Sequence, residues 1–223
     1  YINLISMKKI SSINRMLYLS LLSTVLLIAI RIIYTGNWRF ASLGWNMFLA
    51  FVPFMFSMIL LKKTNSHSWV QYFLLACWLV FFPNAPYIIT DFVHLDHTPP
   101  VPFWYDLVII FWAAWNGLIL GFASLMNVEK FLLTKLSQKK VDVLVCLALV
   151  LCAFGVYAGR YLRWNSWDVV ANPLDIMKDV KHIALNPYDN MRTWGVTSLF
   201  SVLMIMCYFT IRKLGSDGIR QKV

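Results

Sequence analysis

Residues 143–162 have the sequence VLVCLALVLCAFGVYAGRYL, which is uncharged except for Arg160 near its end. A helix of about 20 apolar residues is long enough to cross the hydrocarbon core of a bilayer. Five further apolar runs of similar length lie at about 16–34, 43–61, 69–89, 105–126 and 194–211. The sequence therefore predicts an all-α, integral membrane bundle of about six transmembrane helices.

The composition of the chain leads to the same class. Of its 223 residues, 60% are hydrophobic and 13% are charged. Soluble domains have about 45–50% apolar and about 25% charged residues, so a soluble globule with this sequence would lack the polar side chains to cover its surface. Because six spans leave room only for loops, we expect a single polytopic membrane domain over residues 1–223.

The cysteines and the N-terminal segment carry no signal for disulfides or for cleavage. Cys77, Cys146, Cys152 and Cys207 lie inside apolar runs and form no CxxC pair, so we expect neither a disulfide framework nor a zinc knuckle. The first run has no small-residue cleavage site after it, which indicates a retained span and not a signal peptide.

The distribution of positive charge predicts the orientation in the membrane. The net charge is +10, and of the 20 Lys and Arg residues, 13 lie in the two terminal segments and in the second and fourth loops. Positively charged loops stay on the cytoplasmic side, so we predict that both termini are cytoplasmic. We also predict that the positive charge determines the orientation in the membrane and does not bind nucleic acid. The loops at 90–104 and 163–193 then lie outside.

The second of these outer loops contains a helical pattern. Apolar residues recur at helical spacing at Leu174, Met177, Val180 and Ala184, opposite charged residues. A helix with this pattern lies in the plane of the membrane surface. We therefore predict an amphipathic helix at about 173–185 on the outer face.

The outer end of the third span is interrupted by two prolines in the segment 82–87, FPNAPY. Proline lacks an amide hydrogen and clashes with the preceding turn, so the helix kinks or opens there. Such a break at membrane depth is tolerated where protein or trapped water satisfies the backbone. Asn84 then either bonds to freed carbonyl groups or lies on the wall of an outward-facing cavity.

Acidic and imidazole side chains follow this break at Asp91, His94 and His97, each three positions from the last. On a helix this spacing places them on one face. A carboxylate and imidazoles suit a divalent metal such as zinc, and a carboxylate with one imidazole suits general acid–base catalysis. The remaining alternative is a hydrated helix end without a chemical role.

Few polar residues lie within the spans, where Asn46 and Asn116 are the main ones. No acidic residue lies near a predicted midplane, which disfavours a proton- or ion-driven carrier. Asp106 lies at the mouth of the fourth span, and an ionisable group at that depth usually has a partner. The chain has no phosphate loop, nucleotide-binding glycine pattern or GxSxG sequence.

Two arginines, Arg160 and Arg163, lie three positions apart at the outer end of the fifth span. Two guanidinium groups on one helix face bind a phosphate or carboxylate through paired hydrogen bonds, as in an anionic lipid or a lipid-linked precursor. They equally suit ion pairs with Asp91, Asp106 or Asp168. Asn165 and Asp168 also fit a helix cap and its acidic third residue.

Three blocks of the sequence resemble a known family. Residues 82–95 are FPNAPYIITDFVHL, residues 104–106 are WYD, and residues 159–168 are GRYLRWNSWD. Together they are similar to the bacterial family of polytopic membrane proteins known as domain of unknown function 1361, over about residues 40–211. The resemblance implies a bacterial plasma-membrane location and several spans, and it implies no activity.

These patterns favour a membrane enzyme, a hydrolase or group transferase acting on a lipid-linked or anionic envelope substrate at an outward-facing site. The catalytic candidates are Asp91, His94, Asp106 and Asp168. The substrate-binding candidates are Asn84, Arg160, Arg163 and Asn165, and the metal-ligand candidates are Asp91, His94 and His97. The alternatives are a non-catalytic partner or assembly factor of envelope or export machinery, and a lipid or small-solute transporter.

Overall fold

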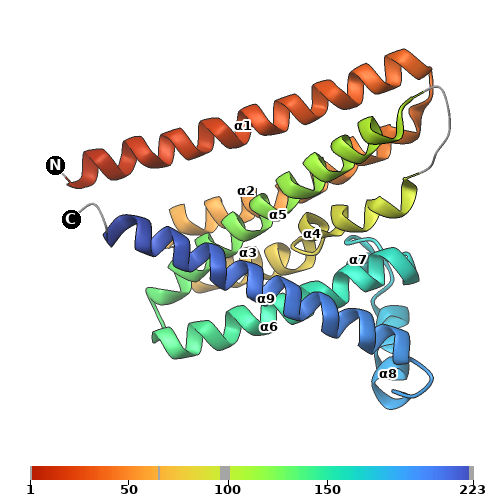
Figure 1. Cartoon of the computed structure of the whole chain (residues 1–223). Helices are drawn as coiled ribbons and strands as arrows, with labels where there is room; N and C mark the ends of the chain where they lie inside the picture. Colours follow the sequence, from red (N-terminus) through yellow and green to blue (C-terminus); the bar gives the residue numbers. More distant parts are fainter. Residues whose placement is uncertain (1, 65, 96–100, 221–223) are drawn as a thin grey trace. The chain divides into compact units, whose positions relative to one another are not determined.

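The computed structural model describes residues 2–64, 66–95 and 101–220, with side chains described for 15–64, 66–95 and 101–215. This part of the chain is helical and contains no strand (Figure 1). The long helices are α1 (Ile2–Thr35), α2 (Ala41–Lys62), α3 (Ser68–Phe81), α5 (Phe103–Leu133), α6 (Gln138–Tyr157) and α9 (Met191–Arg220). The shorter elements are η1 (Trp38–Phe40), α4 (Asn84–Tyr87), η2 (Ile88–His94), η3 (Ala158–Leu162), α7 (Asp168–Ala171) and α8 (Pro173–Leu185).

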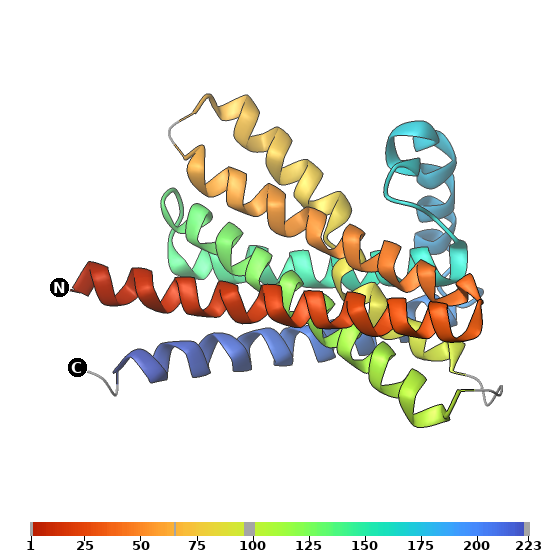
Figure 2. The same cartoon turned by 90° about the horizontal axis from the view of Figure 1, so that it is seen from above.

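Within the described residues, six helical segments are long and apolar enough to cross a membrane, as the sequence predicts. They are Arg15–Thr35, Trp38–Lys62, Ser68–His94, Phe103–Leu133, Gln138–Leu162 and Met191–Gly215. The first segment belongs to α1, which is one uninterrupted helix (Figure 2). The helical fold class and the six spans are therefore confirmed.

By its internal contacts the chain divides into two compact units. Unit 1 comprises Tyr1–Phe51 and Asn84–Gly121, and unit 2 comprises Val52–Pro83 and Phe122–Val223. The expectation of a single polytopic domain remains a prediction.

The third span is not a continuous α-helix. Helix α3 ends at Phe81, and Pro83 and Pro86 fall where the chain passes into the short α4 and the tighter 3-10 turns of η2. The missing amide hydrogens of the two prolines explain why the regular helix stops. The break lets the segment 84–94 place its side chains differently from a regular helix, and this segment carries the candidates Asn84, Asp91 and His94.

Close packing holds the broken segment in place within each unit. In unit 1, a side chain added at Gly117 of α5 would overlap the carbonyl oxygen of Ala85 and reach Ile88 Cδ1 at 3.0 Å. In unit 2, a side chain at Gly155 of α6 would meet Pro83 Cβ at 2.7 Å. Glycine at these two positions therefore permits helices to approach the break more closely than alanine would.

In unit 1, one group of polar contacts between α1 and α5 is centred on Asn116. The amide of Asn116 donates to Thr24 Oγ1 at 2.8 Å and to the Ser20 carbonyl at 3.2 Å, while Ser20 Oγ donates back to Asn116 Oδ1 at 2.7 Å. Asn116 is thus satisfied inside the protein, as a buried amide in a membrane span must be. A cluster of buried apolar side chains that includes Leu43, Ile88 and Ile110 packs the rest of the unit.

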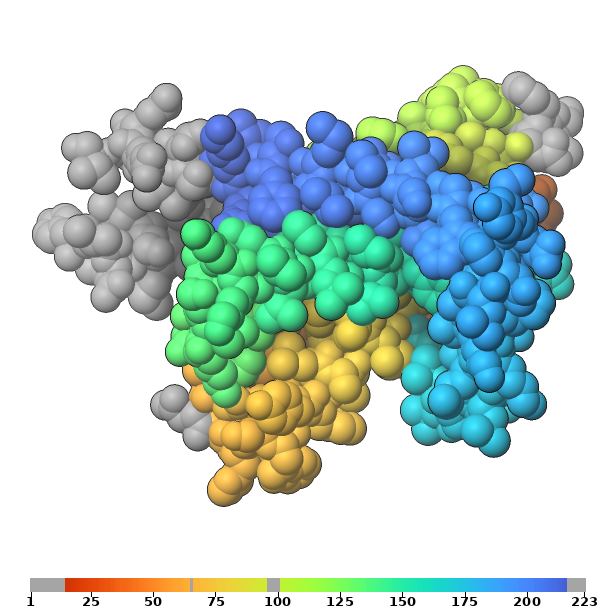
Figure 3. All heavy atoms as spheres, turned by 90° about the horizontal axis from the view of Figure 1, so that it is seen from below, coloured from red at the N-terminus to blue at the C-terminus, as the bar shows by residue number. Residues whose placement is uncertain are grey.

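In unit 2, α6 and α9 pack side by side (Figure 3). Arg212 of α9 donates to Asp142 Oδ1 at 2.8 Å and lies 3.1 Å from Glu129 Oε1 of α5. The buried hydroxyl of Tyr208 also donates to Glu129. These contacts tie three spans together at one end of the unit.

Helix α8 has a different direction from the spans of unit 2. It follows η3 and α7, and it runs across the direction of α6 and α9 (Figures 2 and 3). Its bounds, Pro173–Leu185, match the amphipathic pattern in the sequence.

Candidate functional site

A pocket in unit 1 gathers polar side chains at the end of the unit where α1 passes into α2. Its volume is about 120 Å³, and it is lined by Arg39, Phe40, Ser42, Leu43, Asp91, His94 and Ile110. Phe40, Leu43 and Ile110 are buried and form an apolar wall. The polar lining comes from η1, α2 and η2, so a charged group and a carboxylate–imidazole pair face the same space.

Asp91 is the buried member of this pocket. It lies in η2, is 5% exposed, and accepts a hydrogen bond at 2.8 Å from Asn46 Nδ2 on α2. A buried carboxylate requires such donors because burial alone strongly disfavours the charged form. Asn46 therefore fixes one carboxylate oxygen, Oδ2, and with it the orientation of the group.

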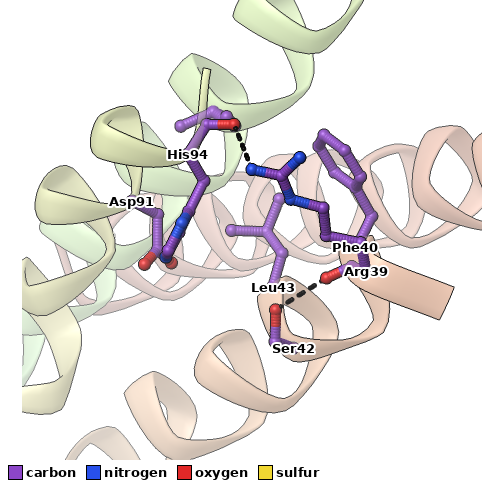
Figure 4. Close-up of a pocket in the computed structure, with 7 residues that line it drawn as sticks. Arg39, Phe40, Ser42, Leu43, Asp91 and His94 are labelled. Carbon is purple, nitrogen blue, oxygen red and sulfur yellow. Dashed lines mark hydrogen bonds between the residues drawn. The ribbon is translucent and has the colours of Figure 1, made fainter. Parts of the chain in front are cut away.

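His94 ends η2 and is exposed at the pocket. Its side chain extends toward the side chain of Asp91 (Figure 4). Its carbonyl oxygen accepts a hydrogen bond at 3.3 Å from Arg39 Nη2. The structure therefore brings Asp91 and His94 together, as their spacing predicts, and adds a guanidinium beside them.

Arg39 is positioned by its own local turn. Its backbone amide donates to Asn37 Oδ1 at 2.9 Å, which caps η1, and its carbonyl oxygen accepts from Ser42 Oγ at 2.9 Å (Figure 4). These bonds hold the entry to α2 while the side chain of Arg39 reaches over the pocket. Ser42 also lines the pocket, and its hydroxyl is directed to this carbonyl.

Asp106 has the partner that its depth in the membrane predicts, and this partner is Arg31 of α1. Arg31 Nε and Nη2 donate to the two carboxylate oxygens at 2.7 and 3.0 Å, and both residues are buried. Arg31 also lies 4.8 Å from the centre of the Phe40 ring. The pair joins α1 to α5 next to the pocket wall, and both oxygens of Asp106 are used in it.

The other described candidates are not among the residues that line this pocket. Asn84 begins α4 in unit 1 and is half-buried. Arg160, Arg163, Asn165 and Asp168 all belong to unit 2. His97 lies outside the described residues, so its part in the metal-ligand prediction stays open. Among the residues that are described, no three His, Cys, Asp or Glu side chains form a group suited to a metal ion.

The candidates of unit 2 form a turn after the fifth span. Arg160 lies in η3, a stretch of wider π-type turns, and Arg163 ends it with a left-handed backbone, φ 60°. Asp168 Oδ2 accepts from the backbone amide of Asn165 at 2.7 Å and from its side-chain amide at 3.3 Å. The acidic residue thus closes a turn on Asn165, but α7 begins at Asp168 with Trp167 as its N-cap residue, so Asn165 does not cap this helix.

The sequence alone predicts no site role for Arg39, and it shows Asn46 only as a polar residue within a span. A signal for Arg39 was present, because it is a cation on the face that the charge distribution assigns to the outside. For Asn46 the signal was its polarity in an apolar run. Neither signal identifies a partner, because both partners lie about 50 positions away in the chain and meet them only through helix packing.

The six membrane-length helices define a multi-pass helical membrane protein with a polar pocket at the helix ends of unit 1. The sequence model of one family, described as protein of unknown function (DUF1361), matches residues 45–207, and the chain belongs to this family. The match includes Asn46, Asp91 and His94, and it begins after Arg39. No curated protein and no solved structure matches the chain.

Proposed function

We propose that this protein is a membrane enzyme, a hydrolase or group transferase, whose active site is the pocket of unit 1. The observation that supports this proposal most strongly is the shared pocket of Arg39, Asp91 and His94. It combines a cation for binding an anion with an imidazole and a carboxylate for proton transfer. The substrate class that fits is a phosphate group carried on a lipid, because the pocket lies at the end of membrane spans.

Each polar residue has a distinct part in the proposed reaction. Arg39 binds the phosphate, since a guanidinium matches the geometry of phosphate oxygens. His94 accepts the proton of an attacking water or acceptor hydroxyl as its oxygen bonds to phosphorus. The same proton then passes to the leaving oxygen as the bond between phosphorus and that oxygen breaks.

Asp91 and Asn46 position the imidazole and do not themselves attack the substrate. A buried carboxylate beside a histidine holds its tautomer and stabilises the protonated ring. We assign Asp106 and Asp168 to structure, because Arg31 and Asn165 engage them. Asn84, Arg160, Arg163 and Asn165 remain substrate-binding candidates on the sequence argument alone.

The proposed setting is the plasma membrane of a bacterium, with both termini in the cytoplasm and the pocket on the outer side. The Lys and Arg distribution supports this orientation, and the family resemblance supports the organism class. With that orientation, the enzyme acts on lipid-linked material of the cell envelope after it has crossed the membrane.

A metal-dependent form of the same site stays an alternative. Catalytic zinc sites use three protein ligands, and Asp91 and His94 supply two, so a third is needed and His97 is the candidate. The acid–base proposal expects phosphate release to persist in a strong chelator. Loss of activity in the chelator, with recovery on adding zinc, would instead make Asp91 and His94 metal ligands.

The proposal is tested by phosphate release from a polyprenyl diphosphate in vesicles that contain the purified protein. His94→Gln keeps a polar side chain but removes the base, and we expect the rate to fall by about 10²–10⁴-fold. His182→Gln is the matched control, because His182 is exposed on α8 in unit 2, and its rate should equal that of the unmodified protein.

Two results would contradict the enzyme proposal. One is unchanged release by His94→Gln, which would separate any activity from this pocket. The other is no release by the unmodified protein from either a polyprenyl diphosphate or phosphatidic acid. That second result, with normal expression, would favour the non-catalytic partner or the transporter.

A further inference from the structure

Helix α8 has three sides with different surroundings. Ile183 is 7% exposed and packs against the protein. By contrast, Leu174, Met177 and Leu185 are 70%, 66% and 67% exposed. Because residues three, four and eleven positions apart share a helix face, these three side chains form one apolar strip, which also includes Val180. This α8 strip does not face the protein's own core.

The opposite side of α8 is polar. Asp175, Asp179 and His182 recur at helical spacing and are exposed. Lys178 lies beside them and pairs with Asp175 at 3.0 Å. Lys181 is exposed on the strip side, seven positions from Leu174 and four from Met177, and the apolar stem of a lysine can lie along such a strip while its charge stays in water. A strip of large exposed apolar side chains with acidic residues on the opposite side is the pattern of a helix that lies at a membrane surface.

The connections of α8 hold it at the level of a membrane surface. It lies in the connection between the spans Gln138–Leu162 and Met191–Gly215. Because a span begins on the side of the membrane where the preceding span ends, both ends of this connection lie on one side. Only the five residues 186–190 separate α8 from α9. Its direction across α6 and α9 (Figures 2 and 3) is the direction that keeps its whole length at that surface.

We propose that the α8 strip docks on the lipid bilayer, with Leu174, Met177 and Leu185 inserted among the upper parts of the acyl chains. The charges of α8 argue for the kind of lipid as well. Its acidic residues, Asp175 and Asp179, balance its basic residues, Lys178 and Lys181. Docking therefore depends on the apolar strip and not on attraction to anionic lipid, so a phosphatidylcholine bilayer suffices.

The test places a nitroxide on the full-length protein in phosphatidylcholine vesicles. The four native cysteines are first replaced by alanine, and labels are then attached in separate variants Leu174→Cys and Met177→Cys. Asp175→Cys and Asp179→Cys are matched controls on the polar side of the same helix. Collisions with oxygen, which concentrates in lipid, and with a water-soluble nickel chelate report the environment of each label.

We expect the labels at 174 and 177 to collide at least several-fold more with oxygen relative to nickel than the labels at 175 and 179. Equal access of all four labels to nickel would overturn the proposal, because the strip would then face water. The proposal would also be overturned if the labels at 174 and 177 were shielded from both reagents and their spectra were broadened by coupling between labels on two copies of the chain. That result would mean that the strip docks on a second copy. Leu185→Cys gives a third strip position if either strip variant fails to fold.

Discussion

Arg31 and Asp106 are 75 positions apart in the chain, yet they form a two-point ion pair inside unit 1. The cost of removing two charges from water is offset there by attraction and by two hydrogen bonds. Removing one partner leaves the other charge buried without compensation. The pair is therefore a sensitive point of the fold next to the proposed active site.

We predict that Asp106→Asn lowers the free energy of unfolding by about 3–5 kcal/mol, the range for a broken buried pair. The measurement is the denaturation midpoint of the purified protein in detergent, monitored as the loss of its monodisperse species. Asp175→Asn is the control, because the Asp175–Lys178 pair is exposed and such pairs contribute about 0–1 kcal/mol. Equal midpoints for both variants would refute the structural role of Asp106.

The sequence predicted that Asp106 has a partner, but it did not identify the partner. The sequence offers Asp106 as an ion-pair partner for Arg160 or Arg163, whereas it distinguishes Arg31 only as one of its positive charges. A helix pattern gives the face of a residue within its own helix, but not which helix lies opposite. For the same reason the sequence predicted that Asp91 and His94 lie together, since their spacing is local. It did not predict that Arg39 joins them, because that contact depends on how the helices pack.

Gly117 of α5 lies against the broken third span, whereas Gly44 of α2 has open space around it. Alanine at position 117 would place a carbon against the backbone oxygen of Ala85, and a backbone atom in a packed helix cannot move aside cheaply. Gly44 lies in α2 of the same unit and has no atom within 4 Å of an added side chain. The two positions therefore form a matched pair.

We predict that Gly117→Ala lowers the free energy of unfolding by about 1–3 kcal/mol, the usual cost of overpacking. Gly44→Ala is expected to leave stability unchanged or to raise it by about 0.5–1 kcal/mol, because alanine favours the helix. Denaturation midpoints in one detergent compare the two variants directly. A Gly117→Ala protein as stable as Gly44→Ala would mean that α5 does not approach the break this closely.

The sequence predicted elements better than it predicted their internal geometry. Long apolar runs determine the spans because hydrophobicity acts over the whole length of a helix. Pro83 and Pro86 indicated where the third span breaks, since a missing amide hydrogen acts locally. The 3-10 turns of η2 and the π-type turns of η3 were not predicted, because they depend on how neighbouring helices pack against the segment.

The class and the family of the molecule follow from the sequence, and the structure adds a pocket in unit 1 that brings Arg39, Asp91 and His94 together. Its features are an apolar wall, a buried carboxylate held by Asn46, an exposed imidazole and a guanidinium. The proposed function depends on the guanidinium of Arg39, because this is the group that would select an anionic substrate over a neutral lipid.

The role of Arg39 is tested by measuring the binding of a polyprenyl diphosphate with native mass spectrometry of the protein released from its membrane. Arg39→Gln removes a charged donor worth about 1.5–3 kcal/mol, so we predict at least about tenfold weaker binding of the lipid. Lys62→Gln removes an exposed charge from the opposite end of the same span and should bind as the unmodified protein does. Undiminished binding by Arg39→Gln, or a loss found instead in Arg163→Gln, would contradict the assignment of the pocket as the substrate site.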